Sequence, residues 1–478
     1  MSAVALSFGT AIGGCASFTP DGGMLSVADI SSGTIGKKVT RVRTEDDARA
    51  VRDRVQGLLA GGPIKGDAAV QIALLNNSGL QASFAELAAI EAQSVEAALP
   101  PSPTISLARL VASRELEIER QVLVNVLSLL TLPRRRELAE GRFRQAQLRA
   151  AEEVLKLAAE TRRAYYRAIA SAQLVTFLEE AKQSAEASSD LAKKLGETGA
   201  LNKINQAREH AFTAELGAQL ATARLRKQAD REQLTRLMGL WGSDTGYRLP
   251  SKLPTLPNRP QSIGDIEAEA LEKRIDLAIG RMELDNLAKS YGLTRITRLI
   301  NVLELRGISK DEWKDAVTPS GDVEREKTDW RGFEFEFQIP IFDFGEARTR
   351  LAEETYMQAA HRLAEKAVNV RSEVRTAYAG YRGSFDIARH YQKEILPLRK
   401  IISDETLLQY NGMLFDLSQL LIDARDRIAS NSAAIEAQRD YWLASTDLHT
   451  AILGGGVGSG TPSGASVMAS GASGAAEH

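Results

Sequence analysis

Cysteine and histidine side chains often supply a nucleophile, a general base or a metal ligand, and this sequence of 478 residues holds few of either. Cys15 is its one cysteine, so neither an intrachain disulfide nor a thiolate metal cluster can form. The five histidines share no motif: His210, His361, His390, His449 and His478. Glycine-rich phosphate loops are absent as well. We therefore expect no enzymatic activity, no metal site and no cofactor.

The composition limits the classes of partner that we expect for this protein. The formal net charge is −2, so no polybasic surface points to nucleic acid as a partner. No run approaches eighteen uninterrupted apolar residues, so the sequence predicts no membrane-spanning helix.

The residues around Cys15 suggest a covalent modification of this cysteine. Residues 1–20 carry no charge, and Ile12-Gly13-Gly14-Cys15 resembles a bacterial lipobox. In that pattern a signal peptide is removed and the cysteine is lipidated, and Ala16 after the cysteine favours sorting to the outer membrane. No lysine or arginine precedes the motif, so either the true start lies upstream or the match is accidental. We expect a signal peptide at 1–14 and lipid attachment at Cys15.

Long helices dominate the rest of the chain. From Arg134 to about Leu195 there is no proline, and apolar residues recur at spacings of three and four. Such a helix rises roughly 90 Å, which suits a coiled coil or a barrel of helices. Glycines at 196 and 199 end it, and a return helix follows from about Asn202 to Leu240.

Between the helices lie four strand-like runs. The first two, Thr104–Val111 and Leu116–Thr131, form a hairpin at about 104–131. The other two, Leu293–Leu305 and Arg331–Ile341, form a second hairpin at about 293–341, separated by the polar loop Gly307–Asp329.

The last strand has two different faces. One face carries glutamate and glutamine, and the other is predicted to face lipid through Phe333, Phe335, Phe337, Ile339 and Ile341. Eleven residues are enough for a tilted strand to cross a bilayer. A half-buried strand of a soluble sheet would show the same alternation, so the pattern alone leaves both interpretations open.

The order of helix, hairpin, long helix and return helix occurs twice in the sequence. Residues near Leu277 match those near Leu80 at an offset of 197, and Gly412-x-Leu414 matches Gly199-x-Leu201 at an offset of 213. We place the sixteen extra residues in the loop Gly307–Asp329. The expected division is a signal peptide (1–14), an extended N-terminal segment (15–65), a first repeat (66–250), a linker with a second repeat (251–453) and a disordered tail (454–478).

Four strands are too few to close a barrel, and open sheet edges cannot face lipid. A membrane-inserted form of this chain must therefore pool hairpins from several copies around a symmetry axis. The long helices would extend the pooled strands as a tube.

The duplicated helix–hairpin–helix plan, the lipobox and the block from Leu407 to Arg425 resemble the TolC-type outer-membrane efflux channels. The family has Tyr-x-x-Gly before a Leu-x-Ala-type stretch, whereas Tyr410-x-Gly412 is one residue shorter here. The resemblance implies a mainly α fold with a small β part. It also implies a homotrimer in which a twelve-stranded β-barrel continues into a periplasmic α-barrel. Its partners would be outer-membrane lipid, a periplasmic adaptor and an inner-membrane pump of a Gram-negative bacterium.

The resemblance also implies roles at two helix turns, at about 196–203 and 409–416. Adaptor contacts would involve Gly199, Leu201, Tyr410, Gly412 and Leu414, with positive φ expected at both glycines. The gate candidates are Asp416, Asp423, Arg425, Asn205 and Arg208. An intrahelical pair of Asp423 with Arg427 is an equally simple interpretation.

The implied function is a passive conduit for small molecules or ions from periplasm to exterior. A coiled-coil scaffold would explain the helices but not the hairpins or the lipobox. A secreted adhesin-like protein would explain strands and helices but not the duplication.

Overall fold

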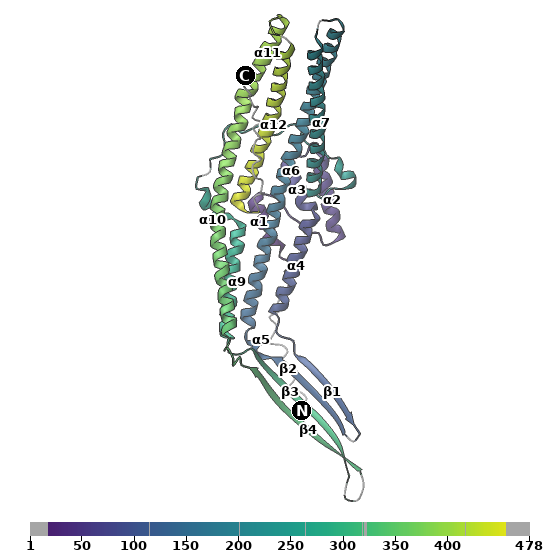
Figure 1. The fold of residues 1–478 in the computed structure, drawn as a ribbon. Helices are drawn as coiled ribbons and strands as arrows, with labels where there is room; N and C mark the ends of the chain where they lie inside the picture. Colours follow the sequence, from purple (N-terminus) through teal and green to yellow (C-terminus); the bar gives the residue numbers. More distant parts are fainter. Residues whose placement is uncertain are drawn as a thin grey trace, which may run out of the picture. The chain divides into compact units, whose positions relative to one another are not determined.

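The computed structural model describes residues 18–113, 115–199, 201–262, 264–317, 319, 323–415 and 417–455 (Figure 1). The expected signal peptide, Cys15, Asp416 and all but two residues of the expected tail lie outside these ranges. The chain divides into two compact units, described here one at a time. The first comprises Met1–Arg54, Leu74–Val154 and Arg274–Asn369, and the second Val55–Ala73, Leu155–Lys273 and Val370–His478.

The order of elements repeats, as the sequence predicts. Helix, two strands, long helix and return helix occur as α4–β1–β2–α6–α7 and again as α9–β3–β4–α10–α11–α12. The helices are α1 (Met24–Ile35), α2 (Glu45–Ala60), α3 (Gly66–Asn76), α4 (Ser78–Ala98), α5 (Val126–Leu130), α6 (Leu132–Glu197), α7 (Lys203–Leu237), α8 (Ile266–Lys273), α9 (Ile275–Ile296), α10 (Glu346–His390), α11 (Leu396–Asn411) and α12 (Leu417–Leu453). The strands are β1 (Thr104–Ala112), β2 (Glu115–Asn125), β3 (Val302–Val317) and β4 (Val323–Gln338).

The first unit contains one sheet. Its strand order is β1-β2-β3-β4, and all three pairings are antiparallel. The two hairpins are therefore joined through β2 and β3, and β1 and β4 form the edges.

Close helix packing supports the sheet in this unit. Gly141 on α6 approaches α9 so closely that an added Cβ would lie 1.9 Å from Oδ1 of Asn286. A larger residue at this position would force the Asn286 side chain to move.

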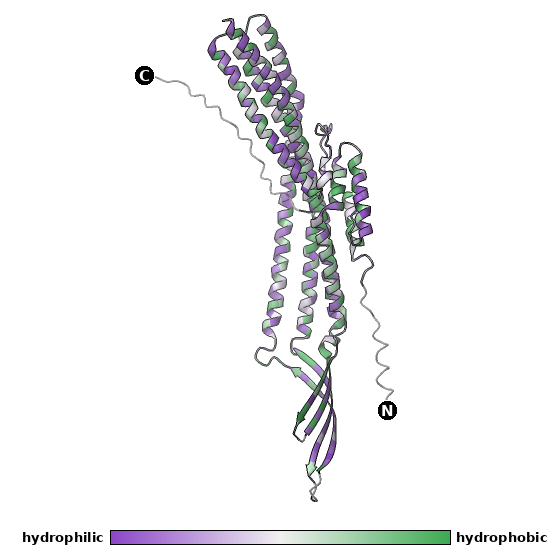
Figure 2. Ribbon diagram, turned by 90° about the vertical axis from the view of Figure 1, so that its right-hand side faces the viewer, coloured by the Kyte–Doolittle hydropathy of each residue, from purple (hydrophilic) through white to green (hydrophobic). Residues whose placement is uncertain are grey.

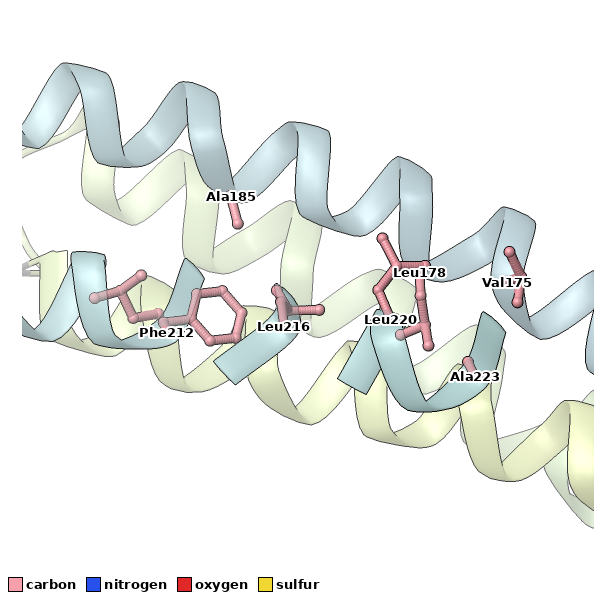
Figure 3. Packing of buried hydrophobic residues seen from close by; sticks show 8 residues of the cluster. Val175, Leu178, Ala185, Phe212, Leu216, Leu220 and Ala223 are labelled. Atoms are coloured by element: carbon pink, nitrogen blue, oxygen red, sulfur yellow. The ribbon is translucent and has the colours of Figure 1, made fainter. Parts of the chain in front are cut away.

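In the second unit α6 and α7 pack along a shared apolar seam. Figure 3 shows Val175, Leu178 and Ala185 on α6 facing the side chains of α7. The α7 side of this cluster consists of Phe212, Leu216, Leu220 and Ala223. These four follow spacings of three and four, so one helical stripe supplies the whole contact.

The segment predicted to be extended, 15–65, is largely helical, and that expectation is wrong. Glycines mark the helix ends in this segment: Gly36 caps α1 at φ 63°, and Gly62 follows α2 at φ 95°. Helix α2 begins with a capping box, in which the Thr44 amide donates to Asp47 Oδ2 at 2.9 Å and the Asp47 amide donates to Thr44 Oγ1 at 3.1 Å.

Three strand predictions also need correction. The expected strand Leu293–Leu305 starts too early, because α9 continues to Ile296 and β3 begins at Val302. β2 ends at Asn125, six residues early, because the Asn125 side chain accepts from the Ser128 amide at 2.7 Å and starts helix α5. Most of the expected loop Gly307–Asp329 is strand, so β3 and β4 have 16 residues each against 9 and 11 in β1 and β2. The insertion in the second repeat thus lengthens its hairpin.

Pro397 lies where the long helix of the second repeat is interrupted. A π-helical turn, Tyr391–Ile395, separates α10 from α11, and Pro397 lies at the start of α11. Proline has no N–H and its ring crowds the carbonyl four residues earlier, here that of Lys393. A local π turn accommodates that loss.

Candidate functional site

The sheet of the first unit has an exposed apolar face at the end of the strands nearest their helices. Residues opposite one another in antiparallel strands share a face, and the register gives the rows Leu303–Phe337, Val124–Leu305–Phe335 and Ile105–Val122–Gly307–Phe333. We call these residues the apolar face. Phe333 is 74% exposed and Phe335 57%, with their rings edge to face at 5.7 Å. A soluble sheet would bury such a face against another layer.

The opposite side of the sheet is ionic, and we call it the charged face. Its members are Glu115, Glu117, Glu119, Glu304, Arg306, Lys310, Glu312, Lys314, Glu334 and Glu336. Ion pairs join neighbouring strands: Arg306 with Glu334 at 3.2 Å and Lys310 with Glu117 at 3.0 Å. Hydrophobic and hydrophilic residues therefore alternate along the part of the strands nearest the helices, and both kinds of residue are present in the strands of Figure 2.

β4 ends at Gln338, so two residues of the predicted lipid-facing strand, Ile339 and Ile341, lie beyond it. Pro340 cannot donate a backbone hydrogen bond, and a turn follows in which the Phe344 amide donates to the Pro340 carbonyl at 2.8 Å. Phe342 is 98% exposed. The apolar surface thus continues past the strand into its connection with α10.

The turn between α6 and α7, in the second unit, agrees with its prediction. Gly199 has φ 77°, and its amide donates to the Gly196 carbonyl at 3.1 Å. Leu201 is half-buried after the turn. Asn202 caps α7, because its side chain accepts from the Asn205 amide at 2.8 Å.

The turn between α11 and α12 differs from its prediction. Gly412 has φ −79°, so the expected positive φ at this glycine is wrong, and Met413 takes the left-handed conformation at φ 59°. The Met413 amide donates to the Tyr410 carbonyl at 3.0 Å, and the Leu414 amide to the Gln409 carbonyl at 2.9 Å. This pair of bonds is a Schellman motif, which requires the left-handed residue one position after the cap. Met413 is 93% exposed and Leu414 77%.

The gate candidates occupy different surroundings. Asp423 is 5% exposed, and its Oδ1 atom has no hydrogen-bond partner among the residues described. The alternative pair with Arg427 does not form, because Arg427 donates to Ser403 Oγ at 3.2 Å. Arg425 lies 3.6 Å from Glu215 and places its guanidinium 5.0 Å from the Phe212 ring centroid. Arg425 therefore links α12 to α7 within one protomer.

Asn205 and Arg208, the two candidates on α7, lie on the first turns of that helix. Asn205 is half-buried and Arg208 is exposed.

Glu209 was not predicted from the sequence. It is fully buried, and neither carboxylate oxygen has a hydrogen-bond partner in the described part of the chain. Burial raises the pKa of the Glu209 carboxyl, against an opposing effect of the Arg425 charge. A signal was present: Glu209 precedes Phe212 and Leu216 at spacings of three and seven, which places a carboxylate on the apolar stripe of α7.

The histidines of the described residues have separate surroundings. His210 Nδ1 lies 2.6 Å from Ser189 Oγ, and His390 Nδ1 lies 3.0 Å from the carboxylate of Glu394. Burial lowers the pKa of His449. Within the described residues, no three His, Cys, Asp or Glu side chains gather as metal ligands would.

None of the helices in the described part of the chain combines the length and the apolar character needed to cross a membrane.

No protein-family model matches the sequence, and no curated protein matches it. Solved structures of outer-membrane channels do match. CusC, studied for its folding and transmembrane channel formation, gives a TM-score of 0.68 at 16% identity, covering 82% of this chain and 92% of CusC. The CmeC channel of Campylobacter jejuni gives 0.65 at 17% identity, covering 90% and 92%. The open state of MtrE from Neisseria gonorrhoeae gives 0.65 at 16% identity, covering 81% and 88%.

This chain therefore has the fold of these outer-membrane channels. The predicted fold class, mainly helical with a small β part and a duplicated plan, is confirmed.

Proposed function

We propose that this chain is the outer-membrane channel of a tripartite efflux or export system, a passive conduit for small molecules or ions from the periplasm to the exterior. The observation that carries the proposal is the sheet, whose apolar face is exposed while its charged face lies directly behind it. A strand between lipid and water needs these two faces. The shared fold with solved outer-membrane channels supports the same function.

The channel works as a homotrimer. β1 and β4 are the unpaired edges of a sheet of four alternating strands, so they run antiparallel to each other. β4 of one copy can continue the ladder with β1 of the next, and three copies then close a barrel of twelve strands. Closure removes the open edges, which lipid does not tolerate. In this barrel the apolar face meets lipid and the charged face lines the water-filled interior.

The periplasmic part of the channel consists of helices α6, α7, α10, α11 and α12. The turns at Gly199 and Met413 present the surface for an adaptor that leads to an inner-membrane pump. Near them, Asp423 and Arg425 belong to the gate that holds the periplasmic end closed, together with Asp416, Asn205 and Arg208. The adjoining residues Leu201, Tyr410, Gly412 and Leu414 complete the adaptor surface.

Lipidation at Cys15 anchors the N-terminus in the outer membrane. Radioactive palmitate should label the wild-type protein in cells and leave Cys15→Ser unlabelled. Mass spectrometry of the mature protein should find acylated Cys15 as its first residue. An intact, unmodified N-terminus on the mature protein would remove lipidation from the proposal.

The function is tested by fractionation and by electrical recording. The protein should partition with the outer membrane, and the purified trimer should form discrete ion-conducting channels in a planar bilayer. A scaffold would remain outside the membrane fraction, and an adhesin would reach the surface without conducting. Membrane insertion without any conductance would therefore reject the conduit.

A further inference from the structure

Two arginines have no carboxylate partner among the described residues. They lie on the side of the sheet that carries the apolar face, which we call the outer surface. Arg331 lies on β4, in a row formed by Leu107, Arg120, Ser309 and Arg331. Arg109 lies on β1, one row further along, with Ile118, Asp311 and Asp329. Both arginine side chains are exposed, and no ion pair joins either of them to another described residue.

The nearby carboxylates are already occupied. Asp311 is 2.8 Å from Arg120 and 3.6 Å from Lys327, and Asp329 is 2.8 Å from Lys327. Cations on the charged face behave differently, because Arg306, Lys310 and Lys314 each lie within 3.2 Å of a glutamate. Arg109 and Arg331 therefore differ from Arg120 and Lys327, which lie on the same side of the sheet and do have carboxylate partners.

These arginines lie where the apolar face ends. The row of Arg331 follows directly on the row of Phe333, about 7 Å along the strands. Two rows further, Trp313 carries the Lys327 ammonium 5.4 Å from its ring centroid. On β3 and β4, apolar rows are followed by charged residues and then by a tryptophan, the order expected where hydrocarbon gives way to headgroups. On β1 and β2 the same rows still contain Leu107, Ile118, Leu116 and Val111.

Closure of the trimer would bring the two arginines to one seam. Arg331 is on one edge strand and Arg109 on the other, and β4 of one protomer adjoins β1 of its neighbour in the proposed barrel. Each seam would then hold two guanidinium groups from two copies. A guanidinium offers paired N–H donors that match the oxygens of a phosphate group.

We propose that Arg109 and Arg331 bind the phosphate groups of a phosphorylated outer-leaflet lipid at each seam between protomers. The inference rests on the proposed function, which places the apolar face in the membrane and the strand turns outside it. Lipid bound here would fasten neighbouring protomers together at their outer edge.

The test measures lipid retention by the purified trimer. Native mass spectrometry would follow the binding of bisphosphorylated lipid A, with dephosphorylated lipid A as the second probe. Wild-type protein should hold the phosphorylated lipid at least roughly tenfold more tightly than the R109Q/R331Q double variant, since charge-assisted hydrogen bonds are lost. Dephosphorylated lipid A should bind both proteins equally weakly. The control K314Q, on the charged face, should bind like the wild type.

Channel recordings separate the two proposals. If the wild type and the double variant both conduct but bind lipid A equally, the phosphate site is wrong and the channel stands. Equal binding of phosphorylated and dephosphorylated lipid by the wild type would also reject the phosphate site. If the wild type neither inserts nor conducts, the channel itself is rejected, and the lipid-facing orientation of the arginines is rejected with it.

Discussion

Met413 has the left-handed backbone conformation, which residues other than glycine adopt only at a cost in free energy. Its φ is 59°, while the neighbouring Gly412 has φ −79°, which any residue can adopt. Met413→Gly should therefore stabilise the protein by about 0.5–1 kcal/mol, since relief of backbone strain exceeds the added freedom of the unfolded chain. Chemical unfolding of the purified protein measures the change.

Two glycine variants are the controls for Met413. Gly412→Ala should change stability little, because an added Cβ would lie 3.4 Å from its nearest neighbour, the Leu408 carbonyl oxygen. Gly199→Ala should cost about 1 kcal/mol, because Gly199 has φ 77°. A loss of stability in Met413→Gly would show that Met413 contributes contacts that outweigh its strain.

Glu209 should make stability depend on pH. Burial raises the pKa of its carboxyl, so the folded protein binds this proton more tightly than the unfolded chain does. Protonated Glu209 therefore stabilises the folded protein. This stabilisation is complete at pH values below the ordinary pKa of 4.5 and is lost as the pH rises through the raised pKa. Glu209→Gln should therefore stabilise the protein at pH 8 and bring little gain below pH 4.5. Thermal unfolding across this range measures both.

Glu215 provides the matched control on the same helix. It is 61% exposed at its side chain and lies 3.6 Å from Arg425. Glu215→Gln should leave the pH profile close to that of the wild type. If Glu209→Gln has the same profile as the wild type, the Glu209 carboxylate is solvated in the assembled channel.

At the scale of the strand, the two faces of β4 should respond differently to charge. Phe335→Arg places a cation on the apolar face, and near the bilayer midplane this costs about 2–4 kcal/mol per subunit. Gln338→Arg adds the same cation three residues away on the opposite face, where Glu336 lies on the same side of the strand. The yield of heat-resistant oligomer in the outer membrane compares them. Equal yields would mean that the face assignment is wrong.

The elements that could be predicted have a local signature. Helix α6 has recurring apolar spacing and no proline after Pro133, and β4 shows phenylalanine at every second position near its end. Residues of β3 beyond Gly307 show no such alternation, because both of their faces are polar. Their pairing depends on β2, where Glu117 forms an ion pair with Lys310 and Arg120 forms one with Asp311. Such long-range ion pairs cannot be read from one segment.

The sites were harder to predict than the elements. The duplicated Gly-x-Leu pattern correctly located both helix turns, but it assigned positive φ to Gly412. Which residue takes the left-handed conformation depends on which carbonyl accepts the hydrogen bond from the Leu414 amide. That hydrogen bond forms only when the helix has folded. Glu209 was overlooked because glutamate is usually exposed, although its place on the apolar stripe was visible.

At the scale of the whole molecule, a single chain is incomplete as a membrane protein. The sheet has two edges, β1 and β4, and no other described strand pairs with their outward backbone groups. In water such groups are hydrated, but in lipid each unsatisfied one costs several kcal/mol. The same fold is therefore consistent with the membrane only if copies share their strands.

Hydrogen exchange can test this closure without any substitution. In the trimer embedded in lipid nanodiscs, the amides of β1 and β4 should be as protected as those of the central strands β2 and β3. In a dissociated protomer held in mild detergent, every second amide of an edge strand faces outward and should exchange roughly a hundredfold faster or more. Amides of α6 and α7, which pack within one protomer, should change far less and serve as the internal reference. Edge strands that exchange rapidly in the nanodisc, while β2 and β3 stay protected, would mean that the sheet remains open and that the barrel does not form.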